Sequence, residues 1–200
     1  NIVIQSAINS LGTVVMAASS AAFNIEIFAY DVLNSFSQAC TTFTGQNYGA
    51  GKIKRCRRTF ILCIIEDAIA SALAIILVLL TGRFLLSIFD SNPQVIETGY
   101  IRLKLIFTAY IFSMLYEVMS GYLRGFGFSL VPALLTTIGV CGTRLIWIYA
   151  VFPKNRTFST IMTAYPVSLS ITALLILIAL LIYRPSKRFS GITPDNSDCD

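Results

Sequence analysis

Residues 157–183, TFSTIMTAYPVSLSITALLILIALLIY, contain no charged side chain. Apolar stretches of about 18 or more residues are long enough to cross the hydrocarbon core of a membrane as a helix. Three further charge-free stretches occupy residues 1–25, 32–51 and 125–143. The whole sequence is 56% hydrophobic and only 12% charged, whereas soluble domains carry about 25% charged residues. We therefore expect an all-α membrane protein.

Apolar runs separated by charged clusters predict six transmembrane helices that form one bundle over residues 1–183. Pro166 removes a backbone hydrogen bond from the last span, so we expect an interruption and a kink there. The polar residues 184–200 predict a disordered cytoplasmic tail. The chain opens inside an apolar run without the charged region of a signal peptide, which indicates a fragment of a longer protein. The six spans are expected at 1–18, 21–45, 59–82, 103–123, 130–152 and 158–183.

The distribution of lysine and arginine predicts the orientation, because cytoplasmic loops of membrane proteins carry more of these residues. Nine lie in loops on one side of the predicted bundle and five on the other. We expect a multi-pass plasma-membrane protein whose nine-residue side, including the carboxyl terminus, is cytoplasmic. The nine are Lys52, Lys54, Arg55, Arg57, Arg58, Arg124, Arg184, Lys187 and Arg188, and the five are Arg83, Arg102, Lys104, Lys154 and Arg156.

Several classes of function are disfavoured by the composition. The chain has no histidine, and its five cysteines show no CxxC spacing, so zinc sites and histidine-based catalysis are not expected. The sequence has no visible pairing of a nucleophile with a base, so we expect neither an enzyme nor a cofactor. The net charge of +5 follows from the basic loops. Basic residues in the loops that orient the protein in the membrane explain this positive charge better than nucleic-acid binding does.

The motif GQNYGAGK, which begins at Gly45, ends a predicted span and leads into the basic cluster. Its glycines allow backbone angles that other residues resist, and its side-chain amides can bond carbonyl groups left free at a helix end. The motif therefore predicts a tight cytoplasmic turn. It does not match the phosphate-binding pattern G-x-x-x-x-G-K-[ST]. The residues expected to build the turn are Gly45, Gln46, Asn47, Gly49 and Gly51.

Four segments together resemble the second half of multidrug and toxic compound extrusion (MATE) transporters, in order and in spacing. The resemblance implies one half of a twelve-helix transporter built from two pseudo-symmetric six-helix bundles. It also implies export of organic cations driven by inward flow of Na⁺ or H⁺, through a cavity shared with a missing amino-terminal half. The segments are GQNYGAGK (45–52), RFLLSIFDSNPQVIETGYIRL (83–103), GYLRGFGFSLVP (121–132), and RLIWIY (144–149) followed by YPVS (165–168).

Five acidic residues fall within the predicted spans, where an unpaired charge costs several kcal/mol and marks a functional candidate. With a rise of about 1.5 Å per residue, Asp31 lies roughly 21 Å from the cytoplasmic end and Glu26 roughly 29 Å. They are about 140° apart around a helix, so at most one is expected to face a cavity squarely. Glu117 is either an ion-binding group or a local partner of Arg124. Glu66 and Asp67 are interpreted as structural groups that reach the basic loop.

Other polar residues in the spans are candidates for cavity or structural roles. Gln5, Asn9 and Asn24 are expected either to form interhelical hydrogen bonds or to line the cavity. Arg144 lies at mid-depth, where it is expected to neutralise Asp31 or Glu26 or to extend toward the outer face. The residues assigned to structure and gating, besides those of the turn, are Arg124, Gly125, Arg144 and Pro166.

The preferred hypothesis is a secondary antiporter in which Asp31 or Glu26 binds the driving ion or the substrate. A flippase for lipid-linked oligosaccharides in the same superfamily is the first alternative, and it predicts a more cationic cavity. The spans are counted with five acids against one arginine, which favours the antiporter. A membrane-embedded protein without transport activity is the second alternative. An upstream six-helix unit with its own GQ-x-x-GA turn would favour the antiporter over the second alternative, and an unrelated soluble domain upstream would not.

Overall fold

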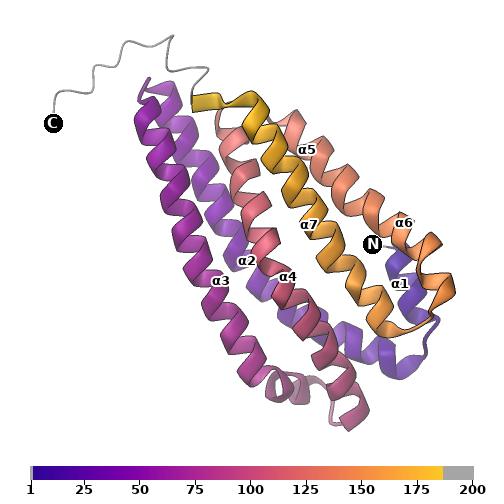
Figure 1. Cartoon of the computed structure of the whole chain (residues 1–200). Helices are drawn as coiled ribbons and strands as arrows, with labels where there is room; N and C mark the ends of the chain where they lie inside the picture. Colours follow the sequence, from indigo (N-terminus) through magenta and orange to yellow (C-terminus); the bar gives the residue numbers. More distant parts are fainter. Residues whose placement is uncertain (1, 187–200) are drawn as a thin grey trace.

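The structure is a computed structural model that describes residues 2–186, and all the regular elements in this range are helices. Five helical segments are long and apolar enough to cross a membrane, and the described part of the chain is thus an all-α membrane bundle, as predicted (Figure 1). The elements are α1 (Ile2–Asn9), α2 (Thr13–Gly49), α3 (Ile53–Phe89), α4 (Pro93–Gly125), α5 (Leu130–Thr136), the π-helix η1 (Thr137–Gly142), α6 (Thr143–Ala150), the 3-10 helix η2 (Phe152–Lys154) and α7 (Phe158–Tyr183).

The boundary predicted between the first two spans, 1–18 and 21–45, is in the wrong place. The short helix α1 ends at Asn9, and Gly12 adopts a φ of 105°, which lies in the region that favours glycine. From Thr13 the chain forms one helix of 37 residues that passes through the expected break. The absence of charge identified the apolar run, but only the backbone angle of Gly12 decides where the helix begins.

The later spans agree better with the prediction. Residues 59–82 and 103–123 lie within α3 and α4, which continue beyond them because polar ends of helices extend past the apolar core. The predicted span 158–183 has the same bounds as α7. This helix continues through Pro166, so the predicted interruption is wrong. The proposed disorder of the tail concerns mainly residues outside the described range.

The predicted span 130–152 is one apolar rod built from α5, η1 and α6. Its π-helical turn contains Gly139, which packs directly on Thr172 of α7. A Cβ atom on Gly139 would clash with the Thr172 hydroxyl, so only glycine permits this close approach. The rod and α7 thus pack closely at this point.

Helix α4 is the centre of the bundle and packs against α2, α3 and α7. In its most apolar window 61% of the residues are buried, compared with 33% or less in the other spans. Gly121 and Gly125 form a GxxxG pattern that lets α4 approach α2 closely. A Cβ atom on Gly121 would lie 2.5 Å from the Ser37 carbonyl oxygen, and one on Gly125 would lie 2.6 Å from the Thr44 Cβ.

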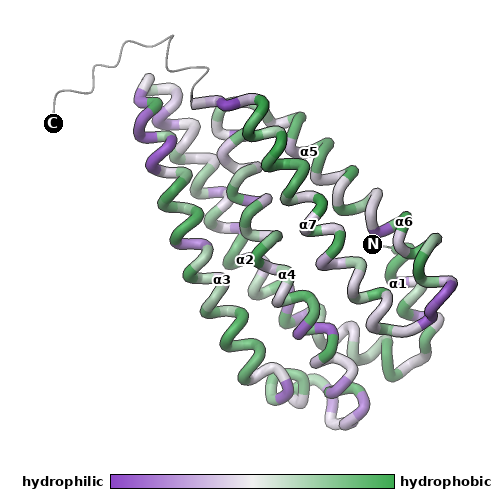
Figure 2. Tube along the Cα trace, in the orientation of Figure 1, coloured by the Kyte–Doolittle hydropathy of each residue, from purple (hydrophilic) through white to green (hydrophobic). Residues whose placement is uncertain are grey.

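The outer surface of the bundle is apolar, as expected for a membrane protein. Large side chains such as Leu80 on α3 and Ile182 on α7 are 80% and 72% exposed. Figure 2 shows hydrophobic residues along the middle of α3 and α7, and hydrophilic residues gathered at the end where α2 and α3 meet. This pattern fits a lipid-facing belt with one strongly polar end.

The predicted tight turn connects α2 to α3, but its glycines have different roles. Gly45 and Gly49 remain helical, and only Gly51 adopts a positive φ, of 72°. The Asn47 side chain donates to the Phe43 carbonyl at 2.7 Å, as expected for an amide at a helix end. The backbone N–H of residue 52 then donates to the Asn47 carbonyl at 2.8 Å and closes the turn.

Candidate functional site

Side chains from α2, α4, η1, α6 and α7 line a pocket of about 360 Å³, here named the tyrosine pocket. Four tyrosines and two arginines contribute to its wall, and Glu26 is the one acidic residue among its lining side chains. Its shape and mixed lining suit a small organic molecule. The lining residues are Phe23, Glu26, Ile27, Tyr30, Arg102, Ile106, Tyr110, Ser113, Tyr116, Val140, Arg144, Tyr165 and Leu169.

Glu26 and Arg102 form a buried, bidentate ion pair in the wall of this pocket. Arg102 Nε donates to Glu26 Oε1 at 2.6 Å and Arg102 Nη2 donates to Oε2 at 2.7 Å. The side chains are only 8% and 4% exposed. Arg102 Nη1 also donates to the Ser19 hydroxyl, and the Tyr110 hydroxyl donates to the Glu26 carbonyl oxygen at 3.2 Å. Each charge is therefore compensated by direct hydrogen bonds.

The sequence interpretation of Arg102 was wrong, because it placed this residue in an outer loop. Arg102 lies inside α4 and is buried. Charged residues on both sides of it, at positions 97 and 104, concealed the helix boundary in the sequence. The helical spacing from the apolar residues Ile106 and Tyr110, at four and eight positions, could have indicated that Arg102 shares their face.

Arg144 also lines the tyrosine pocket and is attached to α7. Its guanidinium carbon lies 4.2 Å from the centroid of the Tyr165 ring, which is the geometry of a cation–π contact. Its Nε donates to the Ser168 hydroxyl at 3.1 Å. The sequence left open whether Arg144 neutralises Glu26 or Asp31 or extends toward the outer face, and in the structure the bidentate partner of Glu26 is Arg102.

Asp31 and Glu26 lie on different faces of α2. Glu26 is buried in the pocket wall, whereas Asp31 is exposed and does not line the tyrosine pocket. The separation of five residues, about 140° around the helix, explains this difference. Within the described part of the chain, Asp31 therefore presents its carboxylate to the outer surface of the bundle.

Glu117 belongs to a polar network between α2 and α4 that borders the tyrosine pocket. The Tyr30 hydroxyl donates to Glu117 Oε1 at 2.9 Å, and Arg124 Nη2 lies 3.9 Å from Oε2. Arg124 Nη2 also donates to the Ser37 hydroxyl at 2.9 Å, and that hydroxyl donates to the Glu117 carbonyl at 2.7 Å. Glu117 is thus tied to Arg124, and also to a tyrosine that lines the pocket.

The three polar candidates near the amino terminus form hydrogen bonds within their own helices. Gln5 donates to Asn9 Oδ1 at 3.0 Å in α1, and Asn24 donates to the Ser20 carbonyl at 3.1 Å in α2. The bonds that Gln5 and Asn24 form are therefore within one helix, and the interhelical bonds expected for them are wrong. Gln5 does line a second pocket of about 360 Å³, which shares Arg102 with the tyrosine pocket.

Asp67 is a buried acid whose environment the sequence interpretation missed. Its side chain is 0% exposed, and neither carboxylate oxygen has a hydrogen-bond partner among residues 2–186. The nearby Ser71 hydroxyl is also without one in this range. Asp67 therefore does not reach the basic loop, whereas the neighbouring Glu66 is exposed. The spacing of Cys63, Asp67 and Ser71 along one helix face is the signal that could have indicated burial.

Comparisons with known proteins agree on one family. The MatE family model matches residues 1–150. The chain is 29% identical over 126 residues to a probable multidrug resistance protein NorM of Thermotoga maritima, a match that covers 61% of this chain and 26% of that protein. It is similar to the crystal structure of a eukaryotic MATE transporter, AtDTX14, with a TM-score of 0.72 and 17% identity. That match covers 88% of this chain and 40% of the transporter, so the chain spans well under half of either relative.

Proposed function

The chain belongs to the MatE family, and from this premise we propose that it is part of a secondary active antiporter that exports organic cations in exchange for Na⁺ or H⁺. The amino-terminal half of the same polypeptide supplies the rest of the cavity wall in this proposal. The two halves rock against each other so that the cavity opens to one side at a time. The small share of each relative that the chain spans supports a partner of this kind.

The observation that carries the proposal is the ion pair of Glu26 and Arg102 in the wall of the tyrosine pocket. Glu26 already holds a cation, the guanidinium of Arg102, with both of its oxygens. A substrate cation or a driving ion that binds Glu26 must first displace that guanidinium. Because a substrate cation and a driving ion would compete for the same two oxygens, occupancy by one disfavours the other, which is the mutual exclusion that antiport needs.

The tyrosines provide the second element of cation recognition. Tyr30, Tyr110, Tyr116 and Tyr165 line the same pocket, and Tyr165 already carries the guanidinium of Arg144 on its face. A flat organic cation is attracted to such ring faces in the same way. Glu26 therefore serves as the charge-selective group and the rings as the shape-selective surface.

Asp31 has a different place in the proposal. Its carboxylate lies on the exposed face of α2 and does not line the tyrosine pocket. We assign it to the face that the amino-terminal half covers, where it contributes an ion-binding or substrate-binding carboxylate to the shared cavity. The protein is placed in the plasma membrane with the basic α2–α3 turn and the end of α7 on the cytoplasmic side, because those ends carry most of the lysine and arginine.

Export of a fluorescent organic cation by the full-length protein, reconstituted in liposomes, tests the proposal. We expect Asp31→Asn and Glu26→Gln each to reduce export at least tenfold without preventing membrane insertion. Glu66→Gln is the matched control, because it removes an acid from the exposed face of a neighbouring span. Unchanged export by Asp31→Asn would remove that residue from the mechanism, and unchanged export by both variants would reject the carboxylate site.

One observation favours the flippase alternative more than the sequence did. Two arginines of the spans, buried Arg102 and half-buried Arg144, line the tyrosine pocket beside one carboxylate. A pocket with two cations and one anion is also suited to a phosphate-bearing substrate. Translocation of a lipid-linked oligosaccharide by the reconstituted protein, together with no flux of organic cations, would support this alternative.

A further inference from the structure

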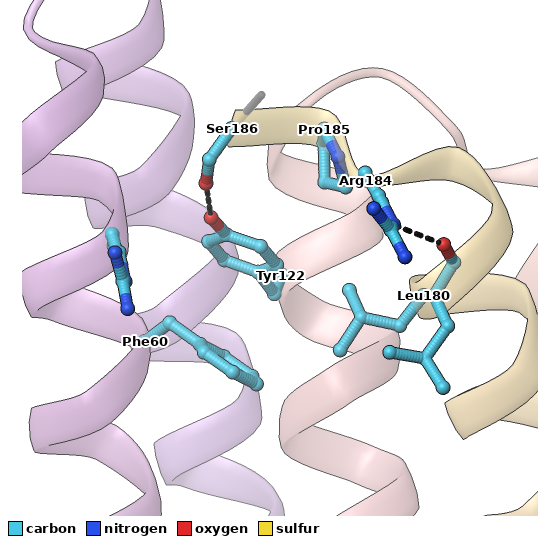
Figure 3. A pocket seen from close by; sticks show the side chains of 8 residues that line it. Phe60, Tyr122, Leu180, Arg184, Pro185 and Ser186 are labelled. Atoms are coloured by element: carbon cyan, nitrogen blue, oxygen red, sulfur yellow. Dashed lines mark hydrogen bonds between the residues drawn. The ribbon is translucent and has the colours of Figure 1, made fainter. Parts of the chain in front are cut away.

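Another cavity, separate from the two described above, lies at the basic end of the bundle, where α3 and α7 both pack on α4. Its volume is about 410 Å³, and we name it the α3–α7 groove. Figure 3 shows Tyr122 of α4 between Phe60 of α3 and the end of α7, with Pro185 and Ser186 closing one side. The residues that line it are Arg57, Phe60, Tyr122, Leu180, Leu181, Arg184, Pro185 and Ser186.

The floor of the groove is apolar and leaves no polar group to satisfy. The rings of Phe60 and Tyr122 lie with their centroids 4.4 Å apart, and the Tyr122 hydroxyl is hydrogen-bonded to the Ser186 hydroxyl. Leu180 and Leu181 form the opposite wall, and Leu181 is 56% exposed. A surface of this kind accommodates a hydrocarbon chain at no cost in lost hydrogen bonds.

The rim of the groove is cationic. Arg57 and Arg184 contribute to its lining and are exposed, and neither forms an ion pair with another residue in the range 2–186. Arg184 Nε donates to the Leu181 carbonyl at 3.0 Å, which fixes the base of the guanidinium beside the groove. Four more exposed basic residues lie on the adjoining end of α3 and its turn, namely Lys52, Lys54, Arg55 and Arg58.

We propose that the α3–α7 groove binds an anionic phospholipid of the surrounding membrane. Arg57 and Arg184 hold the phosphate between them, since guanidinium groups bind phosphate oxygens through paired hydrogen bonds. One acyl chain lies along Phe60, Tyr122 and the α7 leucines. Clusters of lysine and arginine beside a transmembrane helix are the usual recognition element for anionic lipid headgroups. The bound lipid joins the ends of α3 and α7, each of which otherwise packs on α4.

Native mass spectrometry of the full-length, delipidated protein tests this site, with phosphatidylglycerol and phosphatidylcholine of identical acyl chains as probes. We expect phosphatidylglycerol to bind the wild-type protein preferentially. The double variant Arg57→Gln/Arg184→Gln should bind it at least tenfold more weakly. The matched control is Lys154→Gln/Arg156→Gln, which removes the same charge from the opposite end of the bundle and should bind as the wild type does.

Three outcomes would overturn the proposal. The first is unchanged binding of phosphatidylglycerol by the Arg57→Gln/Arg184→Gln variant, and the second is an equal loss in the control. The third is full displacement of the lipid by millimolar inorganic phosphate, which would indicate a simple anion site without a role for the acyl chain. The variant Leu181→Asn measures that role separately, because it keeps both arginines and makes the groove wall polar. We expect it to weaken phosphatidylglycerol binding several-fold.

Discussion

Glu26 and Asp67 are both buried carboxylates in the middle of long helices, but their surroundings are opposite. Glu26 accepts two hydrogen bonds from Arg102 in the wall of the tyrosine pocket, whereas Asp67 has no hydrogen-bond partner among the described residues. The two acids are therefore alike in burial but differ in whether their charge is compensated. Burial in a long apolar helix therefore does not by itself decide whether an acid is compensated by a cation, because that depends on which side chains the neighbouring helices place beside it.

The largest change in stability is expected from removing Arg102, the cation that is paired with Glu26. Arg102→Met leaves Glu26 buried with both oxygens unpaired, which should lower the free energy of unfolding by about 3–5 kcal/mol. Denaturant unfolding of the purified protein in detergent measures this change. The double variant Arg102→Met/Glu26→Gln removes both charges and should recover part of the loss. A double variant no more stable than Arg102→Met would contradict the account of the pair.

Neutralising each acid in turn tests the comparison directly. Glu26→Gln leaves the buried guanidinium of Arg102 without a counter-charge and should cost about 2–3 kcal/mol. Asp67→Asn removes no ion pair and should change the free energy of unfolding by less than about 1 kcal/mol in either direction. Both variants are measured under the same unfolding conditions. Equal destabilisation by the two would show that Asp67 has a partner comparable to Arg102.

Glu117 is intermediate between these two acids, because it has a neutral donor in Tyr30 and a more distant cation in Arg124. Tyr30→Phe deletes the bond to Glu117 at little change in shape and should cost about 1 kcal/mol. Tyr149→Phe is the control, since that side chain is 72% exposed. A thermal unfolding series in detergent compares the two. An equal effect at both positions would mean that the Tyr30 bond contributes no stability.

The smallest effect is expected at an exposed pair with the same chemistry as Glu26 and Arg102. Arg83 Nε lies 3.0 Å from Glu97 Oε1, but the two side chains are 62% and 57% exposed. Water screens this pair, so Arg83→Gln should change the free energy of unfolding by less than about 0.5 kcal/mol. Raising the salt concentration should abolish even that difference. A loss as large as that of Arg102→Met would contradict the role assigned to burial.

The sequence predicted the positions of the later spans well and those of the first two poorly. Charge-free length predicts how much chain fits in a membrane, and the bounds of α7 agree with the predicted 158–183. The same criterion could not locate the break near Gly12, because that break depends on one backbone angle within an unbroken apolar run. The interruption predicted at Pro166 is also not present, because α7 continues through this residue.

The candidate site could be predicted only in part. Glu26 is in the pocket wall and Glu117 contacts Arg124, at positions that the sequence had selected. Arg102 and Asp67 were misjudged because both lie close to charged segments, and depth along the chain does not determine the face of the helix. The amides of Gln5 and Asn24 bond within their own helices, which a one-dimensional pattern does not distinguish from bonds to a neighbour.

The sequence by itself determined that this chain is a helical membrane bundle with one strongly basic end, because hydrophobic length and loop charge are properties of the linear chain. Only the tertiary structure decided which charges meet. Arg102 lies 76 residues from Glu26 and pairs with it, whereas Asp31, five residues from Glu26, faces outward. Pairing depends on the rotation and depth at which α2 and α4 pack, and close contacts at Gly121 and Gly125 contribute to that register.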